Sequence, residues 1–348
     1  MARSLLRWGL SLAVLLLLAV WLGGAWLDQQ IFAPERRPLH SYHLQRLQQP
    51  QAFGLRIRAH DCLAGQAPCL LVEADAAAGP SERGRLLRTQ LHEQGVALPA
   101  YGQHQATLVM LHGRNGRKES LLGVAERFVA AGFRCVLVDL PAHGASPLPE
   151  AGFGSLAFER RLPAAVLQEV RTQFDLPAKP ALLWGMSMGG AVAVGAAAAD
   201  PQPWSALVVI SSFAELDSLL RGFVPERYAG WRDSLLWAVD AGRWLRGKTL
   251  LRNIRPRQWA ANLQLPVLVV HGDADRYVPQ AQGQALFAAL PGTDKHWLSV
   301  PGGGHRNVLA TAMPLYAAMS EWLLQRANTA PLTLSSHAAA PGSPPARQ

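Results

Sequence analysis

The chain has 348 residues, of which 49% are apolar and 16% charged, and its formal net charge is +9. Its length suits one large α/β domain with insertions, and its apolar content is ample for a buried parallel sheet. The arginines are scattered, and we find no aromatic-basic module or metal-ligand spacing, which argues against nucleic-acid binding and against a metal site. We interpret the positive charge as one that attracts the protein to anionic lipid head groups.

The amino terminus is a separate unit. Arg3 and Arg7 precede an uncharged run from Trp8 to Leu27, and about 20 residues suffice to span a bilayer. Basic residues ahead of the run favour an N-inside orientation. The alternative is a cleaved signal peptide, because Gly23 and Ala25 form a small-x-small site. We favour an uncleaved membrane anchor with an exported, periplasmic-type domain; cleavage would instead give a secreted protein.

Composition divides the chain into four parts. Residues 1–27 form the anchor or signal peptide, and residues 28–52 are predicted to be a linker or approach segment. Residues 53–326 are predicted to form the folded domain. Residues 327–348 are rich in alanine, proline and serine, which predicts a disordered tail.

Two cysteines near the start of the domain fit an exported protein. Cys62 and Cys69 flank six residues that are predicted to connect two strands as a hairpin. A hairpin could bring the two sulfurs within bonding distance, and disulfides persist in oxidising compartments. The alternative is two unrelated thiols. Nothing in the sequence indicates an oligomeric state.

From Thr107 onward, apolar strand-like runs alternate with helical stretches, such as 121–131 between two strands. This alternation predicts an α/β fold with a mostly parallel central sheet flanked by helices. Side chains in the loops after successive strands can then converge at one edge of the sheet.

A G-x-S-x-G motif surrounds Ser187. The short apolar run 181–184 precedes it, and the small-residue stretch 190–197 follows it. A strand, a sharp turn and a helix would hold the hydroxyl exposed above the sheet edge, which is the geometry of a nucleophilic serine. The alternative is a Gly/Ser turn without chemistry.

A serine of this kind needs a base and an orienting carboxylate, in the chain order Ser, acid, His. A continuous apolar strand ends at His271 and is followed by a loop with two carboxylates, Asp273 and Asp275. The next strand, around Trp297, runs into three glycines and His305. We therefore expect His305 to be the catalytic base.

These motifs resemble the α/β-hydrolase superfamily of serine hydrolases over approximately residues 106–326. Members commonly carry G-x-x-D-x-x-V-P after the sixth or seventh strand, which matches Gly272, Asp275, Val278 and Pro279. The resemblance implies a triad of Ser187, Asp275 and His305. It also implies that Asp273 is a loop-capping or surface carboxylate.

The resemblance also locates an oxyanion site. The strand 107–111 runs into a His-Gly pair, and the residue after such a pair gives one backbone N–H to the oxyanion. The residue after the nucleophile gives the other, which makes Arg114 and Met188 the implied donors. The side chains of Arg114, Arg117 and Lys118 are expected to be solvated loop charges, with a role in holding an anionic leaving group as the alternative.

Residues 212–262 form an insertion rich in tryptophan and leucine between two strands. In the superfamily an insertion at this point forms a cap over the active site. Most of its apolar residues are expected to build the core of the cap. Some could line an acyl pocket.

The motifs together predict a serine hydrolase that cleaves a carboxylic ester or thioester without a cofactor. The expected substrate is a small or lipid-like molecule that is apolar on its acyl side. The enzymatic alternatives are an acyltransferase, an amidase or a peptidase that uses the same serine. A membrane-tethered binding protein on an inactive hydrolase scaffold is the non-enzymatic alternative.

Overall fold

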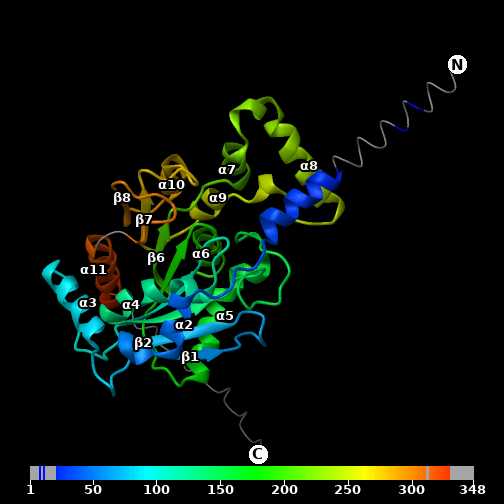
Figure 1. Cartoon of the computed structure of the whole chain (residues 1–348). Coiled ribbons are helices and arrows are strands. Elements are labelled where there is room, and N and C mark those ends of the chain that lie inside the picture. The colour runs from blue at the N-terminus through cyan, green and yellow to red at the C-terminus, as the bar shows by residue number, and fades with distance from the viewer. Residues whose placement is uncertain (1–7, 9–10, 12–20, 311–312, 330–348) are drawn as a thin grey trace, which may run out of the picture.

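The computed structural model describes residues 8, 11, 21–310 and 313–329. Within these residues lies an eight-stranded sheet, whose strands are β1 (Leu55–His60), β2 (Cys69–Ala74), β3 (Ala106–Leu111), β4 (Phe133–Val138), β5 (Ala181–Met186), β6 (Trp204–Ile210), β7 (Val267–Gly272) and β8 (Lys295–Val300). Their order is β1-β2-β4-β3-β5-β6-β7-β8 (Figure 1). β2 is antiparallel to β1 and β4, and the other neighbouring strands are parallel. The predicted, mostly parallel sheet is confirmed.

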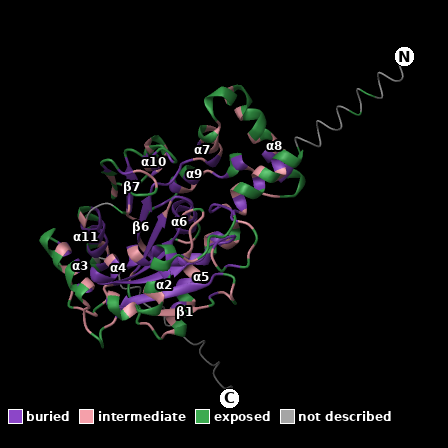
Figure 2. Cartoon of the chain, in the orientation of Figure 1, coloured by how far each residue is buried: buried purple, intermediate pink, exposed green. Residues whose placement is uncertain are grey.

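Among the described residues after residue 40, the α-helices are α2 (Ser41–Gln48), α3 (Glu82–Glu93), α4 (Leu122–Ala130), α5 (Ala157–Gln173), α6 (Met188–Ala199), α7 (Leu216–Phe223), α8 (Arg232–Leu245), α9 (Pro256–Ala260), α10 (Gln280–Ala289) and α11 (Met313–Thr329). Helices α3, α4 and α11 cover one face of the sheet and α5 and α6 cover the other, because the inner strands are apolar on both sides. In β3, Leu108 and Met110 pack with α3, α4 and α11, whereas Val109 and Leu111 pack with α5 and α6. Strands β2 to β7 are accordingly buried almost throughout, whereas the edge strands β1 and β8 are partly exposed (Figure 2).

The segment before the parallel strands is packed onto the domain. A disulfide joins Cys62 and Cys69 at the end of the β1–β2 hairpin. Residues 28–52, expected to be a linker, contain α2. Arg46 of α2 makes a 3.0 Å ion pair with Glu126 of α4, whose carboxylate is fully buried. This contact fixes the approach segment against the same face of the sheet as α4.

Residues 21–32 form a helix that lies beside α8 of the 212–262 insertion (Figure 1). The two helices touch at Gly24, where an added Cβ would lie 2.9 Å from the carbonyl oxygen of Ala238. Among the described residues, no helix is both long and apolar enough to cross a membrane. Most of the apolar run predicted as a membrane anchor, before residue 21, lies outside the described residues.

A buried ion cluster joins this helix to the insertion. Asp28 is 3% exposed and accepts hydrogen bonds from Arg243 and Arg246. Arg243 also pairs with Glu150 at 2.9 Å, and Lys248 reaches the same carboxylate at 2.7 Å. Removing one member of such a cluster would leave an uncompensated buried charge, so the cluster fixes the helix and the insertion relative to each other.

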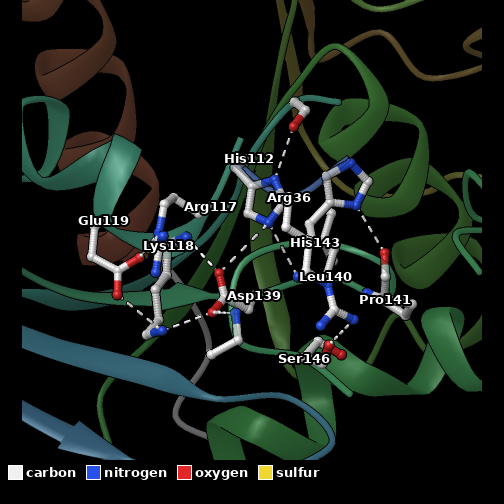
Figure 3. A network of polar contacts seen from close by, with 12 residues as sticks. Arg36, His112, Arg117, Lys118, Glu119, Asp139, Leu140, Pro141, His143 and Ser146 are labelled. Carbon is white, nitrogen blue, oxygen red and sulfur yellow. Dashed lines mark hydrogen bonds and ion pairs between the residues drawn. The ribbon is translucent and has the colours of Figure 1, made fainter. Parts of the chain in front are cut away.

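A second buried cluster supports the loop after β3 (Figure 3). Asp139, at the end of β4, accepts hydrogen bonds from the Lys118 backbone N–H, the Lys118 Nζ and the Ala145 N–H, at 2.7, 2.7 and 2.8 Å. The Oε1 of Glu119 lies 3.0 Å from the same Lys118 Nζ, and its Oε2 lies 2.6 Å from the Arg117 Nε. The expectation of a solvated Lys118 is therefore wrong: its ammonium is paired twice, which offsets the cost of burying it.

His112 connects this cluster to the loop backbone (Figure 3). Its Nδ1 donates to the Gly113 carbonyl at 2.9 Å, and its Nε2 accepts the Leu140 N–H at 3.1 Å. Neighbouring His143 donates to the Pro141 carbonyl at 2.8 Å. Burial lowers the pKa of His143 to about 3 and also lowers the pKa of His112. Both rings are therefore neutral, and His112 fixes the chain direction at Gly113.

The loop before α5 is held by one buried carboxylate. Glu159 is fully buried and accepts hydrogen bonds from the backbone N–H groups of Gly152 and Gly154, at 2.6 and 2.7 Å. These bonds hold the ring of Phe153 against Phe32 and Phe213, with centroids 5.4 and 6.2 Å away. Glu159 therefore controls the contact between the domain, helix 21–32 and the start of the insertion.

The ionisation of Glu159 should make stability depend on pH. Burial raises its pKa to about 7, although the two backbone hydrogen bonds oppose this. Because the pKa is higher in the folded than in the unfolded chain, the stabilisation is fully present below about pH 4.5 and is lost as pH rises through about 7. In urea titrations, the free energy of unfolding of the wild type should fall relative to Glu159→Gln between pH 5 and 8. Parallel pH profiles for the two proteins would contradict this assignment.

Candidate active site

Ser187 stands between β5 and α6 in a conformation that few non-glycine residues adopt, with φ 54° and ψ −118°. The flanking glycines allow it. A Cβ at Gly185 would overlap the Gly189 carbonyl, and a Cβ at Gly189 would overlap the Leu111 carbonyl at the end of β3. Helix α6 can therefore approach the strands closely enough to keep the turn sharp.

Ser212, the second residue after β6, also holds the turn. Its hydroxyl donates to the Ser187 carbonyl at 2.8 Å, and the Ser187 N–H donates to the Ile210 carbonyl at 2.8 Å. An added Cβ at Gly190 would lie 2.8 Å from the Ser212 Cβ, so the two segments are in close contact. The sequence gives no sign of this support, since a serine after a strand carries no distinctive pattern.

The structure brings Ser187, Asp275 and His305 together. The His305 Nε2 lies 3.1 Å from the Ser187 Oγ, and the His305 Nδ1 lies 2.8 Å from the Asp275 Oδ2. Asp273 instead accepts the Gly302 backbone N–H at 2.7 Å and caps the histidine loop. The two acids that the sequence offered thus have different partners, and Asp275 is the one bonded to the imidazole.

The three glycines before His305 allow the acid and histidine loops to touch. A Cβ at Gly272 would overlap the Gly303 carbonyl, and the same carbonyl accepts the Ala274 N–H at 3.0 Å. Side chains at these positions would separate the loops after β7 and β8. The close approach sets the distance between the carboxylate of Asp275 and the ring of His305.

The carboxylate of Asp275 is buried and ionised. Burial alone would raise its pKa, but hydrogen bonds from His305, the Val278 N–H and the Tyr277 N–H lower the pKa below its ordinary value. The two backbone bonds measure 2.8 and 2.9 Å and end on Oδ1, which leaves Oδ2 for His305. A fixed negative charge therefore faces Nδ1 and favours the tautomer with its lone pair on Nε2.

His271, at the end of β7, is a supporting residue that the sequence analysis did not identify. Its Nε2 donates to the Val278 carbonyl at 2.8 Å and lies 3.8 Å from the Asp275 Oδ2. Burial lowers its pKa, so the ring is neutral. It stacks on Trp297 of the next strand. His271 thus braces the turn that supplies two hydrogen bonds to Asp275.

The two segments that carry the implied oxyanion donors both adjoin the serine. Met188 is the first residue of α6, where backbone N–H groups have no partner within the helix. Gly113 lies against the serine, since its added Cβ would be 3.3 Å from the Ser187 Cβ. Arg114 follows it, and its guanidinium donates to the carbonyls of Gln30 and Ile31. That side chain therefore ties the loop to helix 21–32.

Aromatic residues line the approach from the insertion. The ring of Tyr277 lies 5.9 Å from that of His305, and Phe223 at the end of α7 lies 6.5 Å from Tyr277. Gln282 of α10 holds the start of the insertion by accepting the Ala214 N–H at 3.0 Å and donating to the Ser218 hydroxyl at 3.1 Å. The insertion thus reaches the histidine side of the site.

One cluster away from the serine has metal-ligating residue types: His60, Cys62 and Glu169 lie within 4.8 Å of one another. The Cys62 sulfur is committed to the disulfide. Glu169 already accepts hydrogen bonds from His60 and the Leu63 N–H, both at 2.8 Å. The cluster therefore fits a structural role at the hairpin.

Comparison with known proteins identifies the family of the chain. The sequence profile of the family described as "Serine aminopeptidase, S33" matches residues 102–241 and 243–309. A 2-hydroxy-6-oxononadienedioate/2-hydroxy-6-oxononatrienedioate hydrolase of Cupriavidus pinatubonensis is 28% identical over 238 residues, 56% of this chain and 79% of that protein. A monoacylglycerol lipase of Mycolicibacterium smegmatis is 27% identical over 234 residues, 58% of this chain and 81% of that protein.

Among solved structures, the Pyrococcus furiosus esterase Pf2001 has the same fold, with a TM-score of 0.57 and 16% identity over 83% of this chain and 96% of that one. The profile match extends from before β3 to beyond His305 and includes every residue of the site. The chain therefore belongs to the serine aminopeptidase S33 family and is a serine hydrolase of the α/β-hydrolase superfamily.

Proposed function

We propose that the protein hydrolyses carboxylic esters or thioesters through an acyl intermediate on Ser187. The observation that carries the proposal is the imidazole of His305, which lies 3.1 Å from the serine Oγ and 2.8 Å from the buried Asp275 carboxylate. A serine hydroxyl is a weak nucleophile unless a base of this kind removes its proton. Nothing in the arrangement calls for a cofactor.

In the first step, His305 Nε2 takes the Ser187 proton as Oγ attacks the acyl carbon. The negative charge on the former carbonyl oxygen would be stabilised by the backbone N–H groups of Arg114 and Met188. Collapse expels the alcohol or thiol, which receives its proton from His305. Water then attacks the acyl-enzyme by the same route, with His305 again acting as base, and releases the acid. Asp275 stabilises the imidazolium in both steps.

The acyl side of the substrate is proposed to be apolar and to bind beneath the 212–262 cap. Phe223 and Tyr277 support this proposal, because their rings extend from the cap to His305. The similarity to a monoacylglycerol lipase also favours an acyl ester. Binding to an apolar pocket becomes more favourable with each substrate methylene that is removed from water.

The domain is proposed to be exported and held at the membrane by the N-terminal apolar run. Support comes from the uncharged stretch from Trp8 to Leu27 behind two arginines. The disulfide between Cys62 and Cys69 fits an oxidising compartment. If a signal peptidase cleaves the run, the same domain would be secreted.

Replacing Ser187 by alanine should abolish labelling by a fluorophosphonate and lower ester turnover by roughly a thousandfold or more. The substitution removes the nucleophile and leaves the backbone strain unchanged, so the thermal unfolding midpoint should stay close to that of the wild type. Ser120→Ala, at an exposed serine, is the matched control and should label normally. Undiminished labelling of Ser187→Ala would place the chemistry on another residue.

Catalytic efficiency should rise with acyl chain length. Each buried methylene contributes at most about 0.8 kcal/mol, so kcat/KM should increase up to roughly fourfold per carbon until the pocket is full. The gain requires that the longer chain is bound in the transition state. The measurement is kcat/KM for p-nitrophenyl esters from acetyl to decanoyl. Phe223→Ser should flatten the series, whereas Tyr228→Ser, at another exposed aromatic of the cap, should not.

A series that is flat or falls from acetyl upward in the wild type would refute the apolar acyl pocket. Activity on acetyl esters would survive that outcome, because the triad does not depend on the pocket. Transfer of the acyl group to an added alcohol at the expense of hydrolysis would instead identify an acyltransferase.

A further inference from the structure

The outer face of the cap carries large apolar side chains that the described residues leave exposed. Trp231, Trp237 and Trp244 are 67%, 67% and 70% exposed, although tryptophan is a residue that normally buries most of its surface. We call the exposed apolar set the cap ridge; it comprises Trp231, Trp237, Trp244, Leu235, Leu245, Phe223 and Tyr228. An exposed patch of this kind marks an interaction surface.

The ridge is distinct from the side of α8 that packs against the core. Trp237 and Trp244 are seven residues apart on α8 and lie on one side of it. Four residues of α8 are buried. Val239, Gly242 and Arg243 pack inward against the rest of the protein, and Asp240, which lies between Trp237 and Trp244 along the helix, accepts the Leu251 N–H at 2.6 Å. In Figure 2 the outer side of α8 is correspondingly exposed. The helix thus has a core-facing side and a separate aromatic side.

The described end of the N-terminal apolar run, residues 21–27, lies beside this surface. Helix 21–32 continues the run and touches α8 through Gly24 and the buried Asp28. Its own outer residues, Trp21, Leu22 and Trp26, are exposed like those of the ridge. A run proposed to enter a bilayer therefore emerges alongside α8, which brings the ridge close to the same bilayer.

The charge and residue types of the cap fit a lipid surface better than a protein partner. Residues 212–262 contain nine arginines and lysines against five aspartates and glutamates. Arg243, Arg246 and Lys248 are committed to the cluster with Asp28 and Glu150, whereas Arg227 lies over the ring of Tyr228 and forms no ion pair with a described residue. Tryptophan and tyrosine are the residues enriched at membrane–water interfaces, and nearby basic side chains bind anionic head groups. An amphipathic helix with one aromatic face and flanking cations lies in the plane of the interface.

The ridge also leads to the active site. Phe223 belongs to the ridge and contacts Tyr277, whose ring neighbours His305. A lipid that leaves the bilayer at the ridge would meet apolar side chains up to the catalytic imidazole. Figure 1 shows α7 and α8 forming one end of the molecule, with α3 at the other end.

We propose that the cap ridge docks in the head-group region of an anionic bilayer and that acyl substrates enter the active site from there. The lipid contact is independent of ester hydrolysis, whereas the route of entry rests on the proposed function. The ion cluster of Asp28 and Arg243 holds the ridge at a fixed orientation to helix 21–32. The bilayer is thus contacted at two places, by the run and by the cap.

Depth-dependent fluorescence on the full-length chain tests the docking. An environment-sensitive NBD label is attached to Ser234→Cys, an exposed position of α8 next to Trp237, or to Glu93→Cys at the far end of the molecule. The native Cys135 is buried and the other two cysteines are bonded, so the introduced thiol is labelled selectively. The protein is reconstituted into vesicles of equal parts phosphatidylcholine and phosphatidylglycerol, with and without doxyl-labelled lipid.

The Ser234 label should shift to the blue and be quenched by doxyl lipid, and the Glu93 label should remain in water and unquenched. Adding Trp237→Ser and Trp244→Ser should reduce quenching at Ser234 severalfold while the protein still floats with the vesicles. Flotation with no quenching at Ser234 would overturn the docking. A blue shift without doxyl quenching would also overturn it, because a second copy would then cover the ridge.

If the chain does not float with vesicles at all, both the docking and the membrane anchor fail. Esterase activity toward soluble p-nitrophenyl esters is measured on the same samples. That activity tests the proposed function separately, since it depends on the triad and not on lipid contact.

Discussion

The strained backbone of Ser187 is the constraint on which the rest of the site depends. A side chain at φ 54° is costly, and here it is held by close packing on both sides of the turn. Gly185 and Gly189 allow α6 to approach β3 and β5, and Ser212 anchors the serine carbonyl. The parallel sheet then carries the acid and the histidine to the same edge on β7 and β8. A rigid nucleophile with adjustable surroundings suits a fold that serves many substrates.

Around this rigid centre, three buried aspartates have two kinds of role. Asp275 is buried with its charge fully satisfied and serves the chemistry. Asp28 and Asp139 are buried within ion clusters that fix helix 21–32 against the cap and the loop after β3 against β4. These clusters contribute orientation more than stability, since burying paired charges is close to neutral in free energy. As a result, the 212–262 cap, helix 21–32 and the loop after β3 are held in fixed positions relative to one another.

Much of the fold and the meeting of Ser187, Asp275 and His305 could be predicted from the sequence, because apolar strands followed by glycine-rich loops leave a strong local pattern. The choice of Asp275 over Asp273 came from the resemblance to the superfamily's motif and agrees with the hydrogen bonds. The burial of Lys118 could not be predicted, since a lysine in a polar loop looks the same whether or not a distant Asp139 pairs with it. His271 and the contact between Asp28 and Arg243 were missed for the same reason: their partners are far apart in the sequence or bound through the backbone.

The most direct test of the account is a crystal structure of the full-length chain after reaction with an alkyl fluorophosphonate, whose adduct mimics the tetrahedral intermediate. The account predicts phosphorus bonded to the Ser187 Oγ, with the phosphoryl oxygen about 2.7–3.1 Å from the backbone nitrogens of Arg114 and Met188. His305 should stay bonded to Asp275. An adduct on another residue, or a phosphoryl oxygen that points away from both nitrogens, would contradict it.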